Sequence, residues 1–418
     1  MSTLRPSASS SRARGGSPPQ GGEREAVRAI LDAALALIRE RRALDLSMRE
    51  IAAKAGVAPS LVSYHFTSKS QLVADACSLA GEAWREHLAE LSRLLSLALT
   101  VEQRADCGAA WIGGLASARP DLARLWGDVL LAAAHDPALA RVAGEWVGAW
   151  REAWRGCGAN AWMIAEFAAF EMLFAAPMSG AADRDLIMRE ALRRVMRRAE
   201  GAALRAEDSH WHTLLCLDRM DPLSAGQTRE ASVRNRIIEA TADIISEQGA
   251  PAASHRAVAA RAGASLSSMT YHFENRAMLV REGLLRVFQR AMTARPLEGA
   301  PPKGRVAVGE AQMAKVRRDA SGAPGERLVM VRAIAEVAQG AASDGEFRAV
   351  ATELRRIRGL VTRQSIAHAL GLDNVAGADA ADYAVWESGA ALLYDAEQAA
   401  GGGALNTQAA IDAFFLAR

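Results

Sequence analysis

The sequence predicts an all-α protein built from two tandem units, and two observations support this fold class. Half of the 418 residues are hydrophobic but only 5% are aromatic, and the abundance of alanine, leucine and arginine favours helices over sheets. The chain is also too long for one typical core, and residues 254–280 align without a gap to residues 47–73 at an offset of 207. Such a repeat indicates that one helical unit occurs twice.

Composition also limits the class of protein. The net charge is only +2, so contact with nucleic acid must depend on local basic patches. No run of ~18 apolar residues is present, so no membrane span is expected. The four scattered cysteines fit reduced thiols in a cytoplasmic protein. They form no CxxC pair and have no histidine at ligand spacing, so no metal or other cofactor is expected.

The N-terminal segment, residues 1–22, is rich in Ser, Gly, Pro and Arg and contains no acidic residue. We expect a disordered basic arm, and not a secretory signal, because an apolar stretch is missing. The arm is either an untethered tail or a source of phosphate and minor-groove contacts through Arg5, Arg12 and Arg14.

The first two predicted helices follow the arm. Apolar residues recur at helical spacing between Val27 and Ile38 and form an amphipathic face. After a break, Ser47 and Glu50 have the S-x-x-E spacing of a capping box, which starts a new helix at Ser47. Gly56 ends that helix, because glycine readily adopts the positive φ of a helix C-cap.

The next helix is short and is followed by a long one. Pro59 suits a first helical position, since its missing N–H costs nothing there, and the helix ends at His65 or Phe66. Ser68 and Gln71 have the spacing of another capping box and open a longer helix. Two short helices joined by a tight glycine turn predict a helix-turn-helix, whose second helix can enter the major groove of DNA.

Candidate DNA-binding residues lie at both ends of this motif. A helix N-terminus, a phenol, an imidazole and cationic groups can all donate to phosphate oxygens, whereas short side chains on the second helix can read base edges. The candidates for phosphate are Ser47, Arg49, Tyr64, His65 and Lys69, and those for bases are Ser60, Leu61 and Ser63.

The second copy repeats the pattern with two departures. Its candidates, at the offset of 207, are Ser254, Arg256, Ser267, Ser268, Thr270, Tyr271, His272 and Arg276. Ala257 replaces the capping-box glutamate, which costs ~0.5–1 kcal/mol of helix-start stability, and Glu274 adds a negative charge beside the phosphate site. We therefore expect weaker DNA binding by the second motif.

The runs "SMREIAAKAGVAPSLVSYHFTSKSQL" and "SHRAVAARAGASLSSMTYHFENRAML" resemble the DNA-binding domain of TetR/AcrR-family transcriptional regulators. The resemblance covers about fifty residues in each half. It implies a regulator, usually homodimeric, whose helical effector domain binds a small molecule and thereby changes the separation of two recognition helices. The family often has Tyr at the position of Ser63, so Tyr64 is expected to take that phosphate contact.

The expected domains follow from the repeat and from breaks in periodicity. Each unit has an N-terminal helix-turn-helix domain and a C-terminal helical effector or dimerisation domain. The expected ranges are a basic arm at 1–22, a DNA-binding domain at 23–85, an effector domain at 86–205, a linker at 206–230, a second DNA-binding domain at 231–292 and a second effector domain at 293–418.

Aromatic residues concentrate in the first effector domain, and two interpretations remain open. One is ordinary core packing or a helix–helix interface. The other is a pocket for an apolar or aromatic ligand, lined by Trp111, Trp126, Trp146, Trp150, Phe167, Phe170 and Phe174. The pair His210 and His212 lacks a third ligand, so it does not indicate a metal site.

Two motifs in one chain can act as partners for each other. A helix-turn-helix gains affinity from a second one about 34–36 Å away, and a linker of this length allows the halves to dock as an intrachain pseudo-dimer. The predicted target is then a near-palindromic operator, and a homodimer of tandem chains is the competing arrangement.

Other classes of protein fit less well. We find no GxSxG, P-loop, GxGxxG or HExxH motif, so an enzyme is not expected. A transcriptional regulator, most simply a repressor released by a small ligand, fits the sequence best. The alternative is an interaction or sensor protein that has lost DNA binding in one or both motifs. The operator, the effector and the sign of regulation do not follow from the sequence.

Overall fold

The computed structural model describes residues 22–40, 46–98, 100–204, 206–215, 233–293, 305–320, 322–341 and 345–416. Across these ranges the regular structure is helical, apart from one isolated β-bridge between Arg318 and Pro324. The all-α prediction is confirmed. The N-terminal arm and Cys216 lie outside the described residues.

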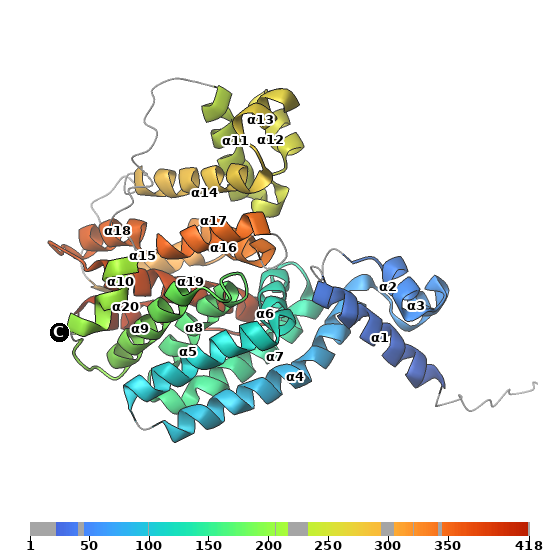
Figure 1. Ribbon diagram of the computed structural model, residues 1–418, viewed down its shortest axis with the longest axis horizontal. Helices are drawn as coiled ribbons and strands as arrows, with labels where there is room; N and C mark the ends of the chain where they lie inside the picture. The colour runs from blue at the N-terminus through green and yellow to red at the C-terminus, as the bar shows by residue number, and fades with distance from the viewer. Residues whose placement is uncertain are drawn as a thin grey trace, which may run out of the picture.

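The first unit comprises α1 to α10, drawn from blue to green in Figure 1. Its helices are α1 (Gly22–Glu40), α2 (Met48–Ala55), α3 (Pro59–His65), α4 (Lys69–Leu97), α5 (Val101–Ala118), α6 (Pro120–Ala133), α7 (Pro137–Trp154), α8 (Ala161–Ala175), α9 (Ala182–Ala199) and α10 (His210–Leu215). The helix α4 is continuous across residue 85, where we expected a domain boundary, so it joins the helix-turn-helix to the helical body.

The second unit follows a similar order, with α17 and α18 in the region that corresponds to α7. Its helices are α11 (Val233–Gln248), α12 (His255–Ala262), α13 (Leu266–His272), α14 (Arg276–Thr293), α15 (Arg305–Val316), α16 (Glu326–Ala341), α17 (Gly345–Arg356), α18 (Leu360–Leu370), α19 (Gly377–Ala399) and α20 (Thr407–Ile411). The chain bends between α17 and α18 at Gly359, which has φ +98° and lies against the backbone of Ala381. In the first unit, α7 runs unbroken through the corresponding region.

The two bodies pack together through α8 and α19. Gly389 lies at the crossing, where an added Cβ would be only 1.8 Å from the carbonyl oxygen of Glu166. The residue must therefore lack a side chain for the backbones to approach this closely. Beside the crossing, Trp386 Nε1 donates to Glu166 Oε2 at 2.8 Å, and Arg151 pairs with Glu397.

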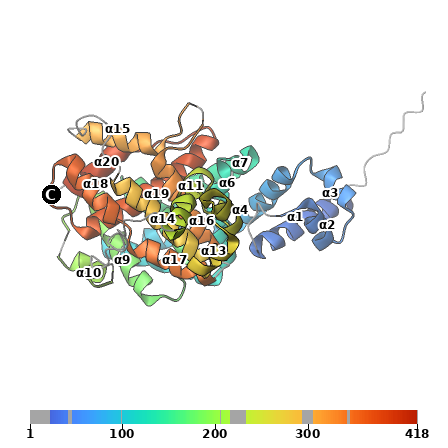
Figure 2. The ribbon, with the colours of Figure 1, turned by 90° about the horizontal axis from the view of Figure 1, so that it is seen from above.

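The two helix-turn-helix domains project from this shared body in different directions. In Figure 1, α2 and α3 lie at the right and α12 and α13 at the top, and Figure 2 confirms that α1 to α3 extend away from the body. Each domain rests on a body helix, since α1 packs on α6 and α11 packs on α16, and α6 packs against α16. These four helices form a continuous packed path between the domains.

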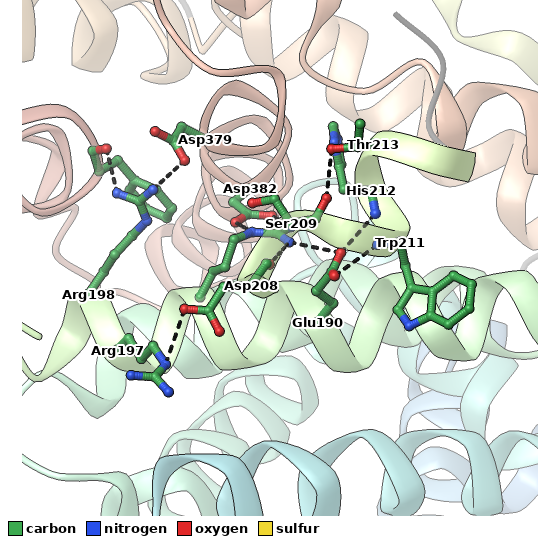
Figure 3. Close-up of polar contacts among 12 residues, drawn as sticks. Glu190, Arg197, Arg198, Asp208, Ser209, Trp211, His212, Thr213, Asp379 and Asp382 are labelled. Carbon is green, nitrogen blue, oxygen red and sulfur yellow. Dashed lines mark hydrogen bonds and ion pairs between the residues drawn. The ribbon is translucent and has the colours of Figure 1, made fainter. Parts of the chain in front are cut away.

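The segment expected to be a linker begins with ordered structure. A 3-10 turn (Ala206–Ser209) leads into α10, and the Glu190 carboxylate accepts hydrogen bonds from the backbone N–H groups of Trp211 and His212 at 2.9 and 2.8 Å. Figure 3 shows Glu190 beneath the start of α10. An acidic group at this position satisfies N–H donors that a helix leaves unpaired. The first residues of the segment are therefore anchored on α9.

The same cluster joins the halves of the chain. Arg194, fully buried on α9, makes a bidentate pair with Asp382 on α19 at 2.6 and 2.8 Å. Arg198 bonds to Asp379 and, at 2.6 Å, to the carbonyl oxygen of Phe414 (Figure 3). A planar guanidinium suits such bidentate contacts. Polar contacts thus fix the relative position of α9 and α19.

Candidate nucleic-acid interface

The first helix-turn-helix has the local geometry that its sequence predicts. Ser47 Oγ accepts from the backbone N–H of Glu50 while the Glu50 side chain accepts from the Ser47 N–H, which completes the capping box. Gly56 has φ +68°, in the left-handed region, and Pro59 is the first residue of α3. Val62 and Phe66 are buried beneath the motif. The opposite face of α3 is therefore left toward solvent.

That face carries the predicted side chains. Tyr64 is 74% exposed, and its ring makes an edge-on contact with His65 at a centroid distance of 5.0 Å. Ser60 and Ser63 are exposed, whereas Leu61 is half-buried. Lys69 starts α4 next to the end of α3 and is half-buried, and Arg49 is exposed on α2. Among the candidates of the first copy, Arg49, Ser60, Ser63 and Tyr64 are thus open to solvent.

The second motif reproduces this arrangement. Gly263 has φ +61°, and Tyr271 is 84% exposed with the same 5.0 Å edge-on contact to His272. Ser254 caps α12 by accepting from the Ala257 N–H, as expected without a glutamate. The remaining candidates on its surface are Arg256, Ser267 and Thr270, which are exposed, and Ser268, which is half-buried. The sequence analysis missed Leu266, which is 58% exposed at the start of α13.

Arg276 occupies a different environment from its counterpart Lys69. Its Nη2 donates to the carbonyl oxygen of Ala250 at 2.8 Å and its Nε to that of Ala253 at 3.2 Å. Its guanidinium also lies over the Phe347 ring, 5.2 Å from the centroid, a favourable cation–π geometry. The side chain expected on DNA phosphate therefore holds the second helix-turn-helix to α17.

The two Ser-capped helix starts also differ in charge. In the first copy the Ser47 hydroxyl and N–H both donate to the Glu50 carboxylate, at 2.7 and 2.8 Å. A phosphate at this helix start would have to displace that carboxylate. In the second copy Ala257 stands in its place, so no acidic side chain of the cap opposes an anion at Ser254. The missing glutamate thus weakens the helix start and favours phosphate there at the same time.

Tryptophans of the first unit pack against one another in the core. Trp84 stacks on Trp126, Trp146 and Trp150 at centroid distances of 5.1, 5.3 and 5.8 Å, and all four are buried. Trp111 packs against the same cluster. The rings of α7 that are spaced four residues apart, Trp146 and Trp150, both meet Trp84 of α4, as the core-packing interpretation predicts. A ligand pocket among these residues stays a prediction.

The remaining predicted pocket residues lie on α8. Phe167, Phe170 and Phe174 are fully buried, and the guanidinium of Arg358 from the second unit lies over the Phe170 ring, 5.2 Å from its centroid. These residues therefore belong to the region where α8 meets the second unit, as the interface interpretation predicts.

No group of three or more His, Cys, Asp or Glu side chains in the described ranges is placed to hold a metal ion. Among the helices that the structure describes, none is both long enough and apolar enough to cross a membrane.

Comparison with known proteins agrees with this geometry. The family model of bacterial regulatory proteins of the tetR family matches residues 30–76 and again residues 237–282. A search of curated proteins found no significant match. The two matched segments contain the two helix-turn-helix motifs described above, each with its capped first helix and exposed Tyr-His pair. The chain therefore carries two DNA-binding domains of the tetR family in tandem, one in each unit.

Proposed function

We propose that this protein is a sequence-specific transcriptional regulator, most simply a repressor, that binds a near-palindromic operator through both of its motifs. The observation that carries the proposal is the pair of exposed tyrosines, Tyr64 and Tyr271, at equivalent positions of two helix-turn-helix domains. A large side chain exposed to this extent contributes little to folding, whereas its hydroxyl is well placed for a phosphate. The protein acts in the cytoplasm and is not an enzyme.

The two units act within one chain as a pseudo-dimer. Arg194 of the first unit pairs with Asp382 of the second, and Glu171 of the first with Arg355 of the second. All four side chains are buried. Breaking a buried pair leaves an uncompensated charge and costs about 3–5 kcal/mol. These pairs therefore favour the association of unlike units.

The repeat alignment supports a preference for pairing between unlike units. By the offset of 208 between residues 134–150 and 342–358, Arg355 corresponds to Val147, and by the similarity of 171–192 to 390–411, Glu171 corresponds to Ala390. If two first units met through this surface, each Glu171 would face a valine. A homodimer through the α8–α19 surface is therefore disfavoured by two unpaired buried carboxylates.

Selection of bound sequences from random DNA with the intact chain tests the function directly. We expect two similar half-sites about one helical turn apart, with light scattering giving one chain per operator. Affinity should fall steeply between low and moderate salt, since phosphate contacts release counterions. The variant with Tyr64, Lys69 and Tyr271 all changed to alanine should lose binding while staying folded. Unchanged affinity in this variant would refute the proposal.

The position of Arg276 favours a second candidate, in which the second motif has lost DNA binding and serves as a sensor or interaction domain. Its guanidinium is engaged by backbone carbonyl groups and by Phe347. The same selection distinguishes the two functions, because a single active motif yields one half-site and no symmetry. A ligand that releases DNA is part of the proposed function in both cases.

A further inference from the structure

The outward face of α13, the second helix of the second motif, carries apolar groups. Leu266 is 58% exposed there, whereas Met269 and Phe273 of the same motif are buried and support the fold. Thr270 is also exposed, and it lies four residues after Leu266, so the two side chains share one face of the helix. A single exposed leucine is ordinary on a protein surface. The hydroxyl groups around this one distinguish it.

The hydroxyl groups on this face bond within the helix itself. Thr270 Oγ1 donates to the carbonyl oxygen of Ser267 at 3.1 Å and to that of Leu266 at 3.3 Å. Ser265 Oγ accepts from the backbone N–H of Ser268 at 3.1 Å, and it is hydrogen-bonded to Ser267 Oγ at 2.8 Å. Because the Thr270 hydroxyl is directed back onto the helix, the methyl group of Thr270 is left for a partner. The face therefore presents a leucine and a methyl group.

The first motif offers different groups at the same positions. At the offset of 207, Pro59 stands in place of Leu266 and Ser63 in place of Thr270. None of the hydrogen bonds found among the described residues involves the hydroxyl of Ser60 or Ser63, and both serines are exposed. The outward face of α3 thus keeps polar groups for base edges, whereas that of α13 has engaged its own.

The neighbours of this face favour DNA over an apolar protein surface as its partner. Tyr271, next to Thr270, is 84% exposed, and Arg256 of α12 is exposed in the same domain. A phenol and a guanidinium suit phosphate oxygens. An apolar area of one leucine and one methyl group is also far smaller than a stable protein–protein interface requires.

Among the groups that base pairs expose in the major groove, the C5-methyl of thymine is the one that an apolar side chain recognises. Side chains four residues apart on a helix are about 5–6 Å apart, and successive base pairs rise by about 3.4 Å. Leu266 and Thr270 can therefore reach methyl groups one or two base steps apart.

We propose that α13 reads thymine methyl groups through Leu266 and Thr270, and that its half-site differs from the half-site of α3 in this requirement. The operator is then symmetric in its phosphate contacts and asymmetric in its bases. The inference rests on the proposed function, since it assigns the base preference of one of the two motifs.

Fluorescence anisotropy with the full-length protein tests the inference on the operator selected from random DNA. Deoxyuridine replaces each thymidine in turn, because it lacks only the C5-methyl group. We expect affinity to fall about fourfold for each methyl group contacted, at one or two positions of one half-site. Leu266→Ala should bind the two operators equally at the position that Leu266 contacts. Met278→Ala, which removes another exposed apolar side chain of the same domain, is the matched control and should keep the full preference.

A second variant separates the two contacts. Thr270→Ser removes the methyl group, keeps the hydroxyl and makes the position resemble Ser63, so it should abolish the preference for thymidine at the other position. Equal affinity for thymidine and deoxyuridine at every position would overturn the inference, as would an unchanged preference in both Leu266→Ala and Thr270→Ser. The operator is still bound in these cases, so only the base assignment fails. If no operator is selected at all, the proposed function fails and the inference with it.

Discussion

The two helix-turn-helix domains are near copies of each other, whereas the two bodies beneath them differ. Both motifs have a serine cap, a left-handed glycine and an exposed tyrosine in the same edge-on contact with histidine. The first body has a tryptophan core, and the second has a bent helix and a buried cation. The residues through which each body contacts the other also differ between the two units. The two motifs thus share one geometry, whereas the two bodies contact each other through different residues.

The largest expected effect is at the junction of the bodies. Gly389→Ala places a Cβ against the Glu166 carbonyl, so α8 and α19 must separate, and we expect a loss of about 3 kcal/mol or more of unfolding free energy. Denaturant unfolding measures it. Gly114→Ala on α5, which meets no atom within 4 Å, is the control and should gain about 0.5–1 kcal/mol. Equal stability of the two variants would contradict the close crossing.

The next effect is a pH dependence at the same junction. Burial raises the pKa of Glu166 to about 7, with Arg151 of α7 lowering it and Glu397 of α19 raising it. The pKa of Glu166 in the folded protein exceeds the ordinary value of 4.5. The contribution of Glu166 to the free energy of unfolding is therefore complete below pH 4.5 and is lost as the pH rises through about 7. From pH 5 to pH 8, the melting temperature of the unaltered protein should fall more than that of Glu166→Gln. Parallel curves would show that Glu166 does not titrate in this range.

A smaller effect tests the likeness of the two motifs. Tyr64→Phe and Tyr271→Phe each remove one exposed hydroxyl without changing the packing, so each should cost about 1 kcal/mol of DNA affinity, or about fivefold. Fluorescence anisotropy with the selected operator measures both, and unfolding curves should match the unaltered protein. If Tyr64→Phe weakened DNA affinity and Tyr271→Phe did not, the two motifs would differ in function. That result would support the sensor alternative for the second motif.

The smallest effect concerns the helix caps. Glu50→Ala makes the first cap resemble the second, and Ala257→Glu does the reverse, so they should change stability in opposite directions by about 0.5–1 kcal/mol. Differential scanning calorimetry of the two variants checks the sign. A decrease in both would indicate that Ala257 is required for packing.

Local signals predicted the local structure. Ser47, Gly56 and Pro59 each determine the conformation of a few neighbouring residues, so their sequence positions were sufficient to place α2 and α3. The environment of Arg276 was not predictable in this way, because Phe347 lies far along the chain. Trp146 and Trp150 have the same spacing in a packed core as in a pocket wall.

The anchoring of α10 on Glu190 shortens the tether that joins the two units. Only the stretch between Leu215 and Val233 is left to span them, and a fully extended chain of that length reaches at most about 65 Å. A unit that detaches therefore remains in a small volume around its partner, at an effective concentration in the millimolar range for flexible tethers. A short tether therefore favours recapture by the same chain over exchange with a unit of another chain, and it keeps one unit of each kind together.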